Sequence, residues 1–275
     1  MDLQAGESAL ETLRFEREGN VGRLKLNRPE RLNAMTGELW NELRDLGAVL
    51  RDDADLRVVV VGGEGRAFSS GIDTSVFAGA FGDAVSSGGT EDRVVEMIMR
   101  TQEAFGWLAD APFATIAAVH GYALGAGLQL ALACDLRVFA RGTTVGLLEL
   151  QYGMMPDLGG TQRLPRLVGP GKAKELIFTR AKIDAEEAHR IGLCERLVDG
   201  AELDAEVTEL ARTIAAQPPL AIRGVKAAIR AAGELEVAAG LRVEAEHQAA
   251  CLVSDDLKEA MAAFAAQRPP RYEGR

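Results

Sequence analysis

Two short glycine-containing loops are the first features of this sequence that could do chemistry. Ser70-Gly71-Ile72-Asp73 and Gly125-Ala126-Gly127 each follow an apolar run and precede a helical pattern. At such a junction, free backbone N–H groups and the positive end of the helix can face one ligand atom. Two donors that converge on one oxygen would form an oxyanion hole, which stabilises an enolate by about 3 kcal/mol per donor. Taken singly, each loop is more simply explained as a tight turn.

The elements around these loops alternate between strand and helix patterns. An apolar hairpin is predicted over residues 13–26, with Gly19-Asn20 at its turn. A helix is predicted from Thr36 to Arg51, because four leucines recur there every three or four residues, and Asn33 or Thr36 could cap it. Further strands are predicted at 57–63, 115–121 and 135–139, and further helices at 91–108 and from 128 to 133.

The last third of the chain is mostly helical in pattern. Helices are predicted at 185–191, 202–216, 219–232, 234–252 and 256–267. The small-residue stretch 77–90 has weak periodicity and is predicted to be mobile. The order of elements indicates an α/β core over residues 1–200 and a C-terminal helical region over 201–275.

Composition narrows the possible partners. The chain has 275 residues and a net charge of −10, which disfavours nucleic acid and anionic membrane surfaces. Its N-terminus lacks the pattern of a signal or transit peptide, and the apolar run 111–134 is interrupted by proline, glycine and polar residues, so no membrane span is expected. The three cysteines, Cys134, Cys194 and Cys251, are typical of buried thiols in a reducing compartment, which favours the cytoplasm.

Four stretches carry a resemblance to a known family. They are Leu26-Asn-Arg-Pro-Glu-Arg-Leu-Asn-Ala34, Ala67-Phe-Ser-Ser-Gly-Ile-Asp73, Val119-His-Gly-Tyr-Ala-Leu-Gly-Ala-Gly127 and Pro156-Asp-Leu-Gly-Gly-Thr-Gln-Arg-Leu164. In order and spacing they resemble the enoyl-CoA hydratase/isomerase (crotonase) family over nearly the whole chain. The resemblance implies a crotonase-like spiral of ββα units with a C-terminal helical trimerisation region, and trimers that commonly pair as hexamers. It also implies an acyl-CoA thioester substrate, whose coenzyme A is not a separate cofactor, and no metal.

The resemblance also assigns roles to residues. Ile72 and Ala126 match the backbone donors of the family's oxyanion hole, which stabilises a thioester enolate. Glu149 matches a catalytic glutamate, and burial among apolar neighbours should raise its pKa. Gln129 matches the second glutamate of the family's hydratases, and an amide there could orient a water but cannot take a proton. Asp157 is similar to an aspartate of the family's dienoyl-CoA isomerases, although a turn residue or N-cap would also explain it.

These matches favour double-bond isomerisation with Glu149 and Asp157 as the proton-transfer groups. The alternative is a 2-enoyl-CoA hydratase in which Glu149 handles the proton and Gln129 orients the water. A non-catalytic acyl-CoA-binding protein is the alternative from another class. For the substrate's CoA and thioester parts, the resemblance points to a further set of residues: Arg31, Leu32, Ala34, Ser70, Asp73, Gly125 and Arg268. Arg268 would reach the CoA phosphates in its own or a neighbouring subunit, although it could equally belong to a solvated C-terminus.

Overall fold

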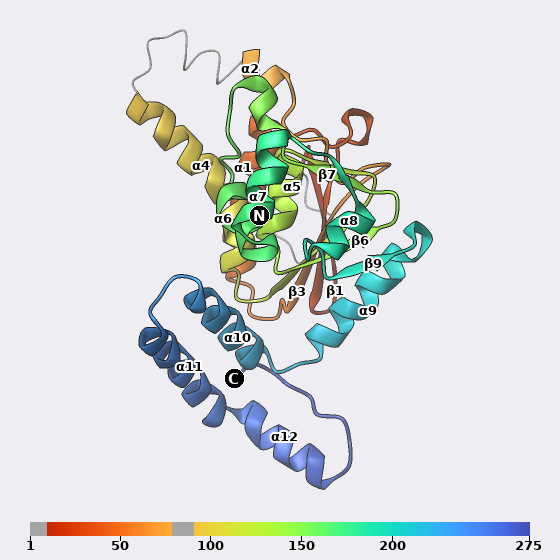
Figure 1. Ribbon diagram of the computed structural model, residues 1–275. Helices are drawn as coiled ribbons and strands as arrows, with labels where there is room; N and C mark the ends of the chain where they lie inside the picture. The colour runs from red at the N-terminus through yellow and green to blue at the C-terminus, as the bar shows by residue number, and fades with distance from the viewer. Residues whose placement is uncertain (1–9, 79–90) are drawn as a thin grey trace.

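Two sheets form the centre of the computed structural model, which describes residues 10–78 and 91–275 (Figure 1). The larger sheet has the strand order β1 (Leu13–Glu18), β2 (Val21–Leu26), β3 (Val58–Gly63), β4 (Ala114–Val119), β6 (Leu136–Ala140) and β9 (Arg196–Val198). The β1–β2 pair is the predicted antiparallel hairpin, and the other pairs of this sheet are parallel. The smaller sheet has the order β5 (Tyr122–Leu124), β7 (Thr144–Gly146) and β8 (Ile183–Asp184).

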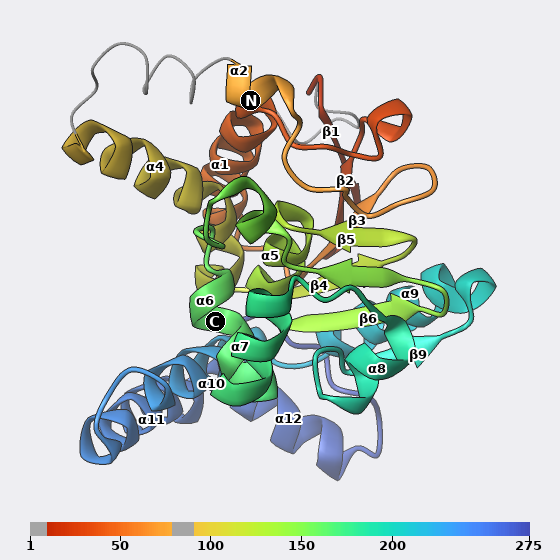
Figure 2. The same ribbon diagram turned by 45° about the horizontal axis from the view of Figure 1, so that its top comes forward.

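The chain repeats one unit: a strand in the large sheet, a strand in the small sheet, then a helix. The clearest repeats are β4–β5–α5 (Ala126–Ala133) and β6–β7–α6 (Gly160–Val168), the second with a 3-10 turn η2 (Glu149–Tyr152) before its helix. In the two earlier repeats the second strand is reduced to isolated parallel bridges, Met35 with Ile72 and Ser69 with Ala123. The predicted spiral of ββα units is therefore confirmed, and Figure 2 shows one of its repeats, β4, β5 and α5. The bridge of Ser69 with Ala123 places the two glycine loops side by side.

Helix α1 (Gly37–Arg51) shows how the local sequence sets an element. The side chain of Thr36 accepts a hydrogen bond from Leu39 N at 3.3 Å and caps the helix, while the four leucines predicted to form its stripe are buried. Asn33, the other predicted cap, has a different role. Its side chain accepts from Arg28 N and donates to the carbonyls of Glu64 and Ala67, so it ties the preceding loop to the loop after β3.

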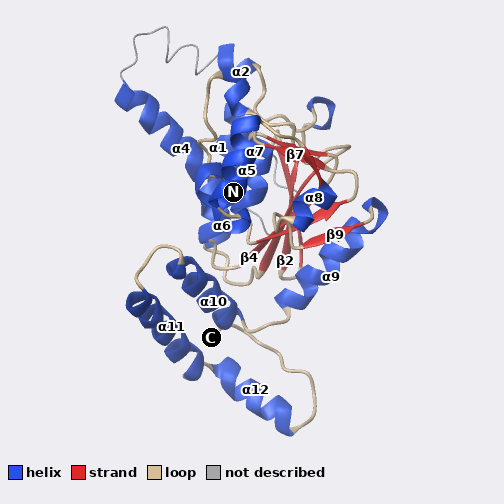
Figure 3. Cartoon of the chain, viewed as in Figure 1, coloured by secondary structure: helices blue, strands red, loops and turns tan. Residues whose placement is uncertain are grey.

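Helices cover both faces of the large sheet (Figure 3). Val59 and Val61 of β3 point into a core that includes α1, α4 (Glu91–Asp110) and α5. Val58 and Val60 point to the other face, where they meet α9 (Leu203–Ala215). A strand buried on both faces is an unbroken apolar run, which explains the four successive valines of β3. The remaining elements are η1 (Pro29–Arg31), α2 (Ser75–Ala78), α7 (Pro170–Thr179), α8 (Ala185–Arg190) and η3 (Gly200–Glu202).

The C-terminal helices are confirmed, and the last three extend away from the sheets: α10 (Pro219–Ala232), α11 (Val237–Leu252) and α12 (Asp255–Ala265) (Figure 1). Helix α10 is fastened to the core by Lys226, whose Nζ donates to the carbonyls of Leu108 and Phe113 and lies 2.8 Å from an Asp135 oxygen. Helix α11 packs along α10 but contains no buried residue. This part of the chain therefore exposes apolar side chains that the core does not cover.

Several smaller predictions can be compared with these elements. The run 111–134 forms β4, β5 and α5, and among the described residues no helix is long and apolar enough to cross a membrane. Cys134 and Cys194 are buried, but Cys251 is only partly buried. The stretch 77–90, predicted to be mobile, lies outside the described residues except for its first two positions, which end α2. Helices α6 and α7 were not predicted from the sequence.

Candidate active site

The two glycine loops lie against each other. Ser69 N donates to the carbonyl of Tyr122, and Leu124 N donates back to the carbonyl of Ser69, so the loops begin from a shared pair of backbone bonds. Gly71 has a φ of +103°, and a Cβ added there would lie 2.9 Å from Leu124 O and 3.8 Å from Ala126 N. A glycine is thus needed at position 71 both for its backbone angle and for the approach to the second loop.

The N–H groups of Ile72 and Ala126 find no acceptor among the described residues. The residues on either side of Ile72 both form hydrogen bonds with Met35. Met35 N donates to Gly71 O and Asp73 N donates to Met35 O, both at 2.8 Å. Ala126 is the first residue of α5, where the helix dipole is positive. Both residues line a cavity of about 80 Å³, which Ser70, Gly125 and Glu149 also line. Two free donors at one small cavity are the arrangement that an oxyanion hole requires.

A second layer of bonds holds the first loop in place. Ser70 N donates to Leu32 O, and the Ser69 hydroxyl donates to Asn33 O. Both Leu32 and Asn33 have left-handed backbone angles, which turn their carbonyls towards the loop. The buried Ser69 and Asn33 are positioning residues that sequence reasoning missed, since their partners lie more than thirty residues away.

Asp73 closes the loop rather than facing the cavity. One of its oxygens accepts from the N–H and hydroxyl of Ser75, and the other accepts from Arg28 Nη1 at 3.0 Å. The bonds from Ser75 are the main reason that the pKa of Asp73 is lowered from its usual value, and Arg28 adds to the effect. Asp73 is therefore held as a carboxylate that fixes the start of α2.

Glu149 is the carboxylate nearest the second loop. It is 6% exposed, and a Cβ added at Gly125 would lie 3.4 Å from its Oε1. Burial raises the pKa of Glu149, and the charge of Asp157 raises it further, while a hydrogen bond from Gln129 lowers it. The Oε2 atom is buried and has no hydrogen-bond partner among the described residues. A poorly solvated carboxylate beside free N–H donors is suited to taking a proton from a bound ligand.

Gln129 lies on α5, all of whose residues are buried, and its side chain connects two segments. Its Nε2 donates to Glu149 Oε1 at 2.7 Å. Its Oε1 accepts from Leu158 N at 2.8 Å and from Gly160 N at 2.9 Å. Both acceptor positions of the amide oxygen are therefore occupied by the backbone.

Asp157 lines a different, larger cavity of about 690 Å³, together with residues of α4, α6 and α10. Burial raises the pKa of its carboxyl group. Its backbone oxygen accepts from the side chain of Gln102 on α4, so the position of the segment is fixed from two sides. The structure thus brings Glu149 to the glycine loops, whereas it places Asp157 in a neighbouring cavity, close enough for its charge to act on Glu149.

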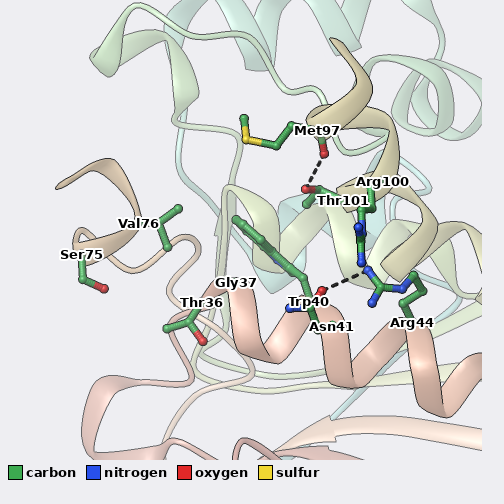
Figure 4. Close-up of a pocket in the computed structure, with 10 residues that line it drawn as sticks. All are labelled: Thr36, Gly37, Trp40, Asn41, Arg44, Ser75, Val76, Met97, Arg100 and Thr101. Atoms are coloured by element: carbon green, nitrogen blue, oxygen red, sulfur yellow. Dashed lines mark hydrogen bonds between the residues drawn. The ribbon is translucent and has the colours of Figure 1, made fainter. Parts of the chain in front are cut away.

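A third cavity of about 350 Å³ lies between α1, α2 and α4 (Figure 4). Trp40, Val76 and Met97 give it an apolar side, and Arg44 and Arg100 line its other side. Val76 follows the first glycine loop by three residues. Consecutive residues of this segment therefore line first the loop cavity and then this cavity. It is a second direction in which an apolar part of a ligand could extend.

The residues predicted to contact coenzyme A are only partly brought together. Leu32 adjoins the first loop through its carbonyl, Ala34 is buried, and Arg31 is exposed at the end of η1. Arg268 instead forms a two-point ion pair with Glu259, at 2.6 and 2.8 Å. It follows α12, which lies at the opposite end of the molecule from α2 and the first loop (Figures 1 and 2).

Known proteins resemble this chain over almost its whole length. Residues 16–275 match the family model of enoyl-CoA hydratase/isomerase. A crotonyl-CoA hydratase from Syntrophomonas wolfei is 34% identical over 96% of this chain and 98% of that protein. The crystal structure of an enoyl-CoA hydratase from Bacillus anthracis has a TM-score of 0.88 and 33% identity, covering 96% of this chain and 100% of the other. An enoyl-CoA hydratase homologue from Thermobifida fusca, solved in complex with acetoacetyl-CoA, has a TM-score of 0.81 and 41% identity, covering 89% and 96%.

Proposed function

This chain belongs to the enoyl-CoA hydratase/isomerase family of enzymes, and on that premise we propose that it moves a double bond within an acyl-CoA thioester. The observation that carries the proposal is the buried Glu149 carboxylate, with one unpartnered oxygen, beside the free N–H groups of Ile72 and Ala126. The thioester oxygen accepts from these two N–H groups. As Glu149 takes a proton from the acyl chain, the electron pair moves into the carbonyl and the resulting enolate is stabilised there.

Asp157 is proposed to return a proton at a carbon farther along the chain. Burial raises the pKa of its carboxyl group, which favours the protonated form that a general acid needs. Because Asp157 lines the larger cavity, the acyl chain would extend from the glycine loops towards that cavity, past Glu149. Protonation at the distal carbon and collapse of the enolate shift the double bond, and no atom of water is added. An extended conjugated chain, such as a dienoyl group, would span the two carboxyl groups.

Hydration of a 2-enoyl-CoA is the second candidate, and the names of the relatives favour it. In this reaction Glu149 would activate the water alone. The carbonyl oxygen of Gln129 is occupied by two backbone donors, so the amide could help only through its remaining N–H. The acyl chain would then have no need to reach Asp157, and the cavity between α1, α2 and α4 could take it instead.

The substrate assay separates these candidates. Purified protein is incubated with 2-enoyl-, 3-enoyl- and 3,5-dienoyl-CoA in deuterium oxide, and the products are followed by mass and absorbance. A moved double bond without added water supports the isomerase, and addition of heavy water to the 2-enoyl chain supports the hydratase. Tight binding with no change in any substrate would indicate a non-catalytic acyl-CoA-binding protein.

The Asp157→Asn variant assigns the second proton-transfer group. An isomerase that uses both carboxyl groups should lose about 10²–10⁴-fold in kcat, the usual contribution of a general acid or base. A hydratase that depends on Glu149 should retain most of its rate. Asp45→Asn is the matched control, because Asp45 is 67% exposed on α1 and, within residues 10–78 and 91–275, pairs with its neighbour Arg44 alone.

The CoA portion is proposed to lie along the segment that carries Arg31, Leu32 and Ala34, next to Ser70 and Gly125 of the loops. Arg268 is paired with Glu259. It can bind a CoA phosphate only if the phosphate replaces that carboxylate or if the CoA is bound by a neighbouring subunit. The KM of Arg31→Ala and Arg268→Ala for the best acyl-CoA substrate of the wild type, compared with that for the same acyl group on a truncated pantetheine, tests both assignments. A phosphate contact predicts a loss only with the full CoA ester.

We also propose that the chain assembles as a homotrimer, which could pair into a hexamer. Val237 and Leu241 of α11 and Phe264 of α12 are 77%, 56% and 85% exposed in the single chain. Apolar side chains gathered on one region of a protein surface mark an interface. Sedimentation velocity at micromolar concentration should give a trimer or hexamer, and Leu241→Glu should reduce it to smaller species. Exposed Glu244→Gln on the same helix is the control, and a monomeric wild-type protein would contradict the proposal.

A further inference from the structure

The contacts of Gln129 define the orientation of its amide without ambiguity. The oxygen must face Leu158 N and Gly160 N, because both are donors. The amino group must then face Glu149 Oε1, which only accepts when ionised. Gln129 is 1% exposed, and a Cβ at Gly160 would lie 2.9 Å from its oxygen, so a glycine at 160 is what permits the bond from the turn.

We propose that Gln129 is a positioning residue that couples the two proton-transfer segments and selects Oε2 of Glu149 as the oxygen that exchanges the proton. This inference rests on the proposed function, and it identifies Gln129 as the residue that determines how the two proton-transfer groups are placed. The amide fixes Oε1 of Glu149 on one side and the Leu158–Gly160 turn on the other. Oε2 is left without a partner among the described residues, and Asp157 is the residue immediately before the anchored turn.

An amide performs this task with a single residue because it donates at one end and accepts at the other. A leucine at position 129 would fill a similar volume, but it would leave the N–H groups of Leu158 and Gly160 buried without acceptors. It would also remove the bond to Oε1 that prevents the Glu149 carboxylate from rotating. A glutamate could accept from the turn, but its second oxygen would face Glu149 Oε1, and two carboxylates at that distance must share a proton. The three residue types therefore predict three different sites.

The same contacts determine how each substitution changes the ionisation of Glu149. The bond from Gln129 favours the charged form of Glu149, whereas burial and the charge of Asp157 disfavour it. Asp157 is the charged side chain of the described residues that acts on Glu149. Removal of the donor in Gln129→Leu should raise the pKa of Glu149. In Gln129→Glu the two neighbouring carboxylates repel each other, which should raise the pKa further. That pKa would belong to the pair of glutamates and not to Glu149 alone.

The first test measures ionisation and does not depend on turnover. Infrared difference spectra between pH 4 and 9 report the protonated carboxyl band of Glu149, which is identified by its absence in Glu149→Gln. We expect the titration of this band to move to higher pH in Gln129→Leu. Exposed Gln217→Leu, at the end of α9, should leave it unchanged. An unchanged Glu149 titration in Gln129→Leu, in a protein shown to be folded by circular dichroism, would overturn the proposal.

The second test measures the coupling to Asp157 by a double-mutant cycle on the best substrate of the wild type. If Gln129 positions the Asp157 segment, Gln129→Leu should lower kcat at least tenfold with a smaller change in KM. Asp157→Asn should then cost less in the Gln129→Leu background than in the wild type. Independent, multiplicative losses would overturn the coupling. A wild type without turnover, combined with the shifted Glu149 band, would sink the proposed function and retain Gln129 as the residue that holds Glu149.

Discussion

The candidate site has two halves that are built in different ways. The oxyanion half consists of the backbone of two loops, held by the left-handed Gly71 and by bonds within the ββα repeat. The proton-transfer half consists of side chains from three segments, which Gln129 joins. Among the described residues, the backbone half has two N–H donors without an acceptor, whereas the side-chain half has one buried carboxylate oxygen without a partner.

This difference separates what is general from what is particular in the site. A pair of backbone donors recognises any thioester carbonyl, since no side chain determines which acyl group follows. In the proposed mechanism Glu149, Asp157 and Gln129 determine where protons leave and arrive, and so they would determine the reaction. Changes in the backbone half should therefore impair all substrates together, while changes in the side-chain half should alter the choice among reactions.

The largest effect is expected at Glu149, the base of the side-chain half. Glu149→Gln should lower kcat by about 10²–10⁴-fold, as loss of a general base does, because an amide cannot take the proton. Substrate affinity, measured by titration calorimetry with a non-reactive acyl-CoA, should change much less. If Glu149→Gln retained most of its kcat, Glu149 would not be the base and the division between the halves would fail.

A smaller loss is expected from Gly71→Ala in the backbone half. The added Cβ would lie 2.9 Å from Leu124 O, in a backbone conformation with a φ of +103° that alanine disfavours. The loops should separate and the two donors should no longer converge, which by analogy with loss of one oxyanion donor costs about 10²-fold in kcat. Gly142→Ala is the control, because Gly142 has a φ of +79° but nothing within 4 Å of its added Cβ. Equal losses in both variants would attribute the effect to backbone strain alone.

The two halves also differ in how far they could be predicted from sequence. The glycine loops are local patterns, and their position between strand and helix was enough to suggest free N–H donors. The contacts of Gln129 join residues 20 to 31 positions apart, so no local pattern indicates them. Resemblance to the family supplied Gln129 and Asp157 as candidates, but not the bonds of the first or the separate cavity of the second.

The fold shows the same limit in its weakly patterned elements. Helices with a regular apolar stripe, such as α1, were predicted to within a residue or two. Helices α6 and α7 were missed because Pro165 lies inside the first, and Gly169 and Pro170 separate the two. Such residues normally end a helix. Here the tertiary contacts of the buried Leu164 and Leu176 outweigh that local preference.

The two buried carboxyl groups of the side-chain half should contribute to the pH dependence of stability. Burial raises the pKa of both Glu149 and Asp157, so the folded protein binds protons more tightly there than the unfolded chain does. Their contribution to stability is fully present below the unfolded values, near 4.5 and 3.8, and is lost as pH rises through the folded pKa values. Denaturant unfolding from pH 4 to 8 should therefore show Glu149→Gln gaining stability relative to the wild type as pH rises. A constant difference across this range would contradict the assignment.

The smallest effect is expected at Asp73, which lies in the backbone half although it is a carboxylate. Asp73→Asn keeps one oxygen to accept from Ser75, but it replaces the partner of Arg28 with a donor. Loss of this partly buried charge-assisted bond should lower the free energy of unfolding by about 1.5 kcal/mol and kcat by less than tenfold. Asp45→Asn, at an exposed ion pair, should change neither measurably. A loss in kcat comparable to that of Glu149→Gln, without a loss of stability, would place Asp73 among the proton-transfer groups. The oxyanion half would then depend on a charged side chain and not on backbone N–H donors alone, because the removal of a side-chain charge cannot abolish a reaction that uses only backbone donors.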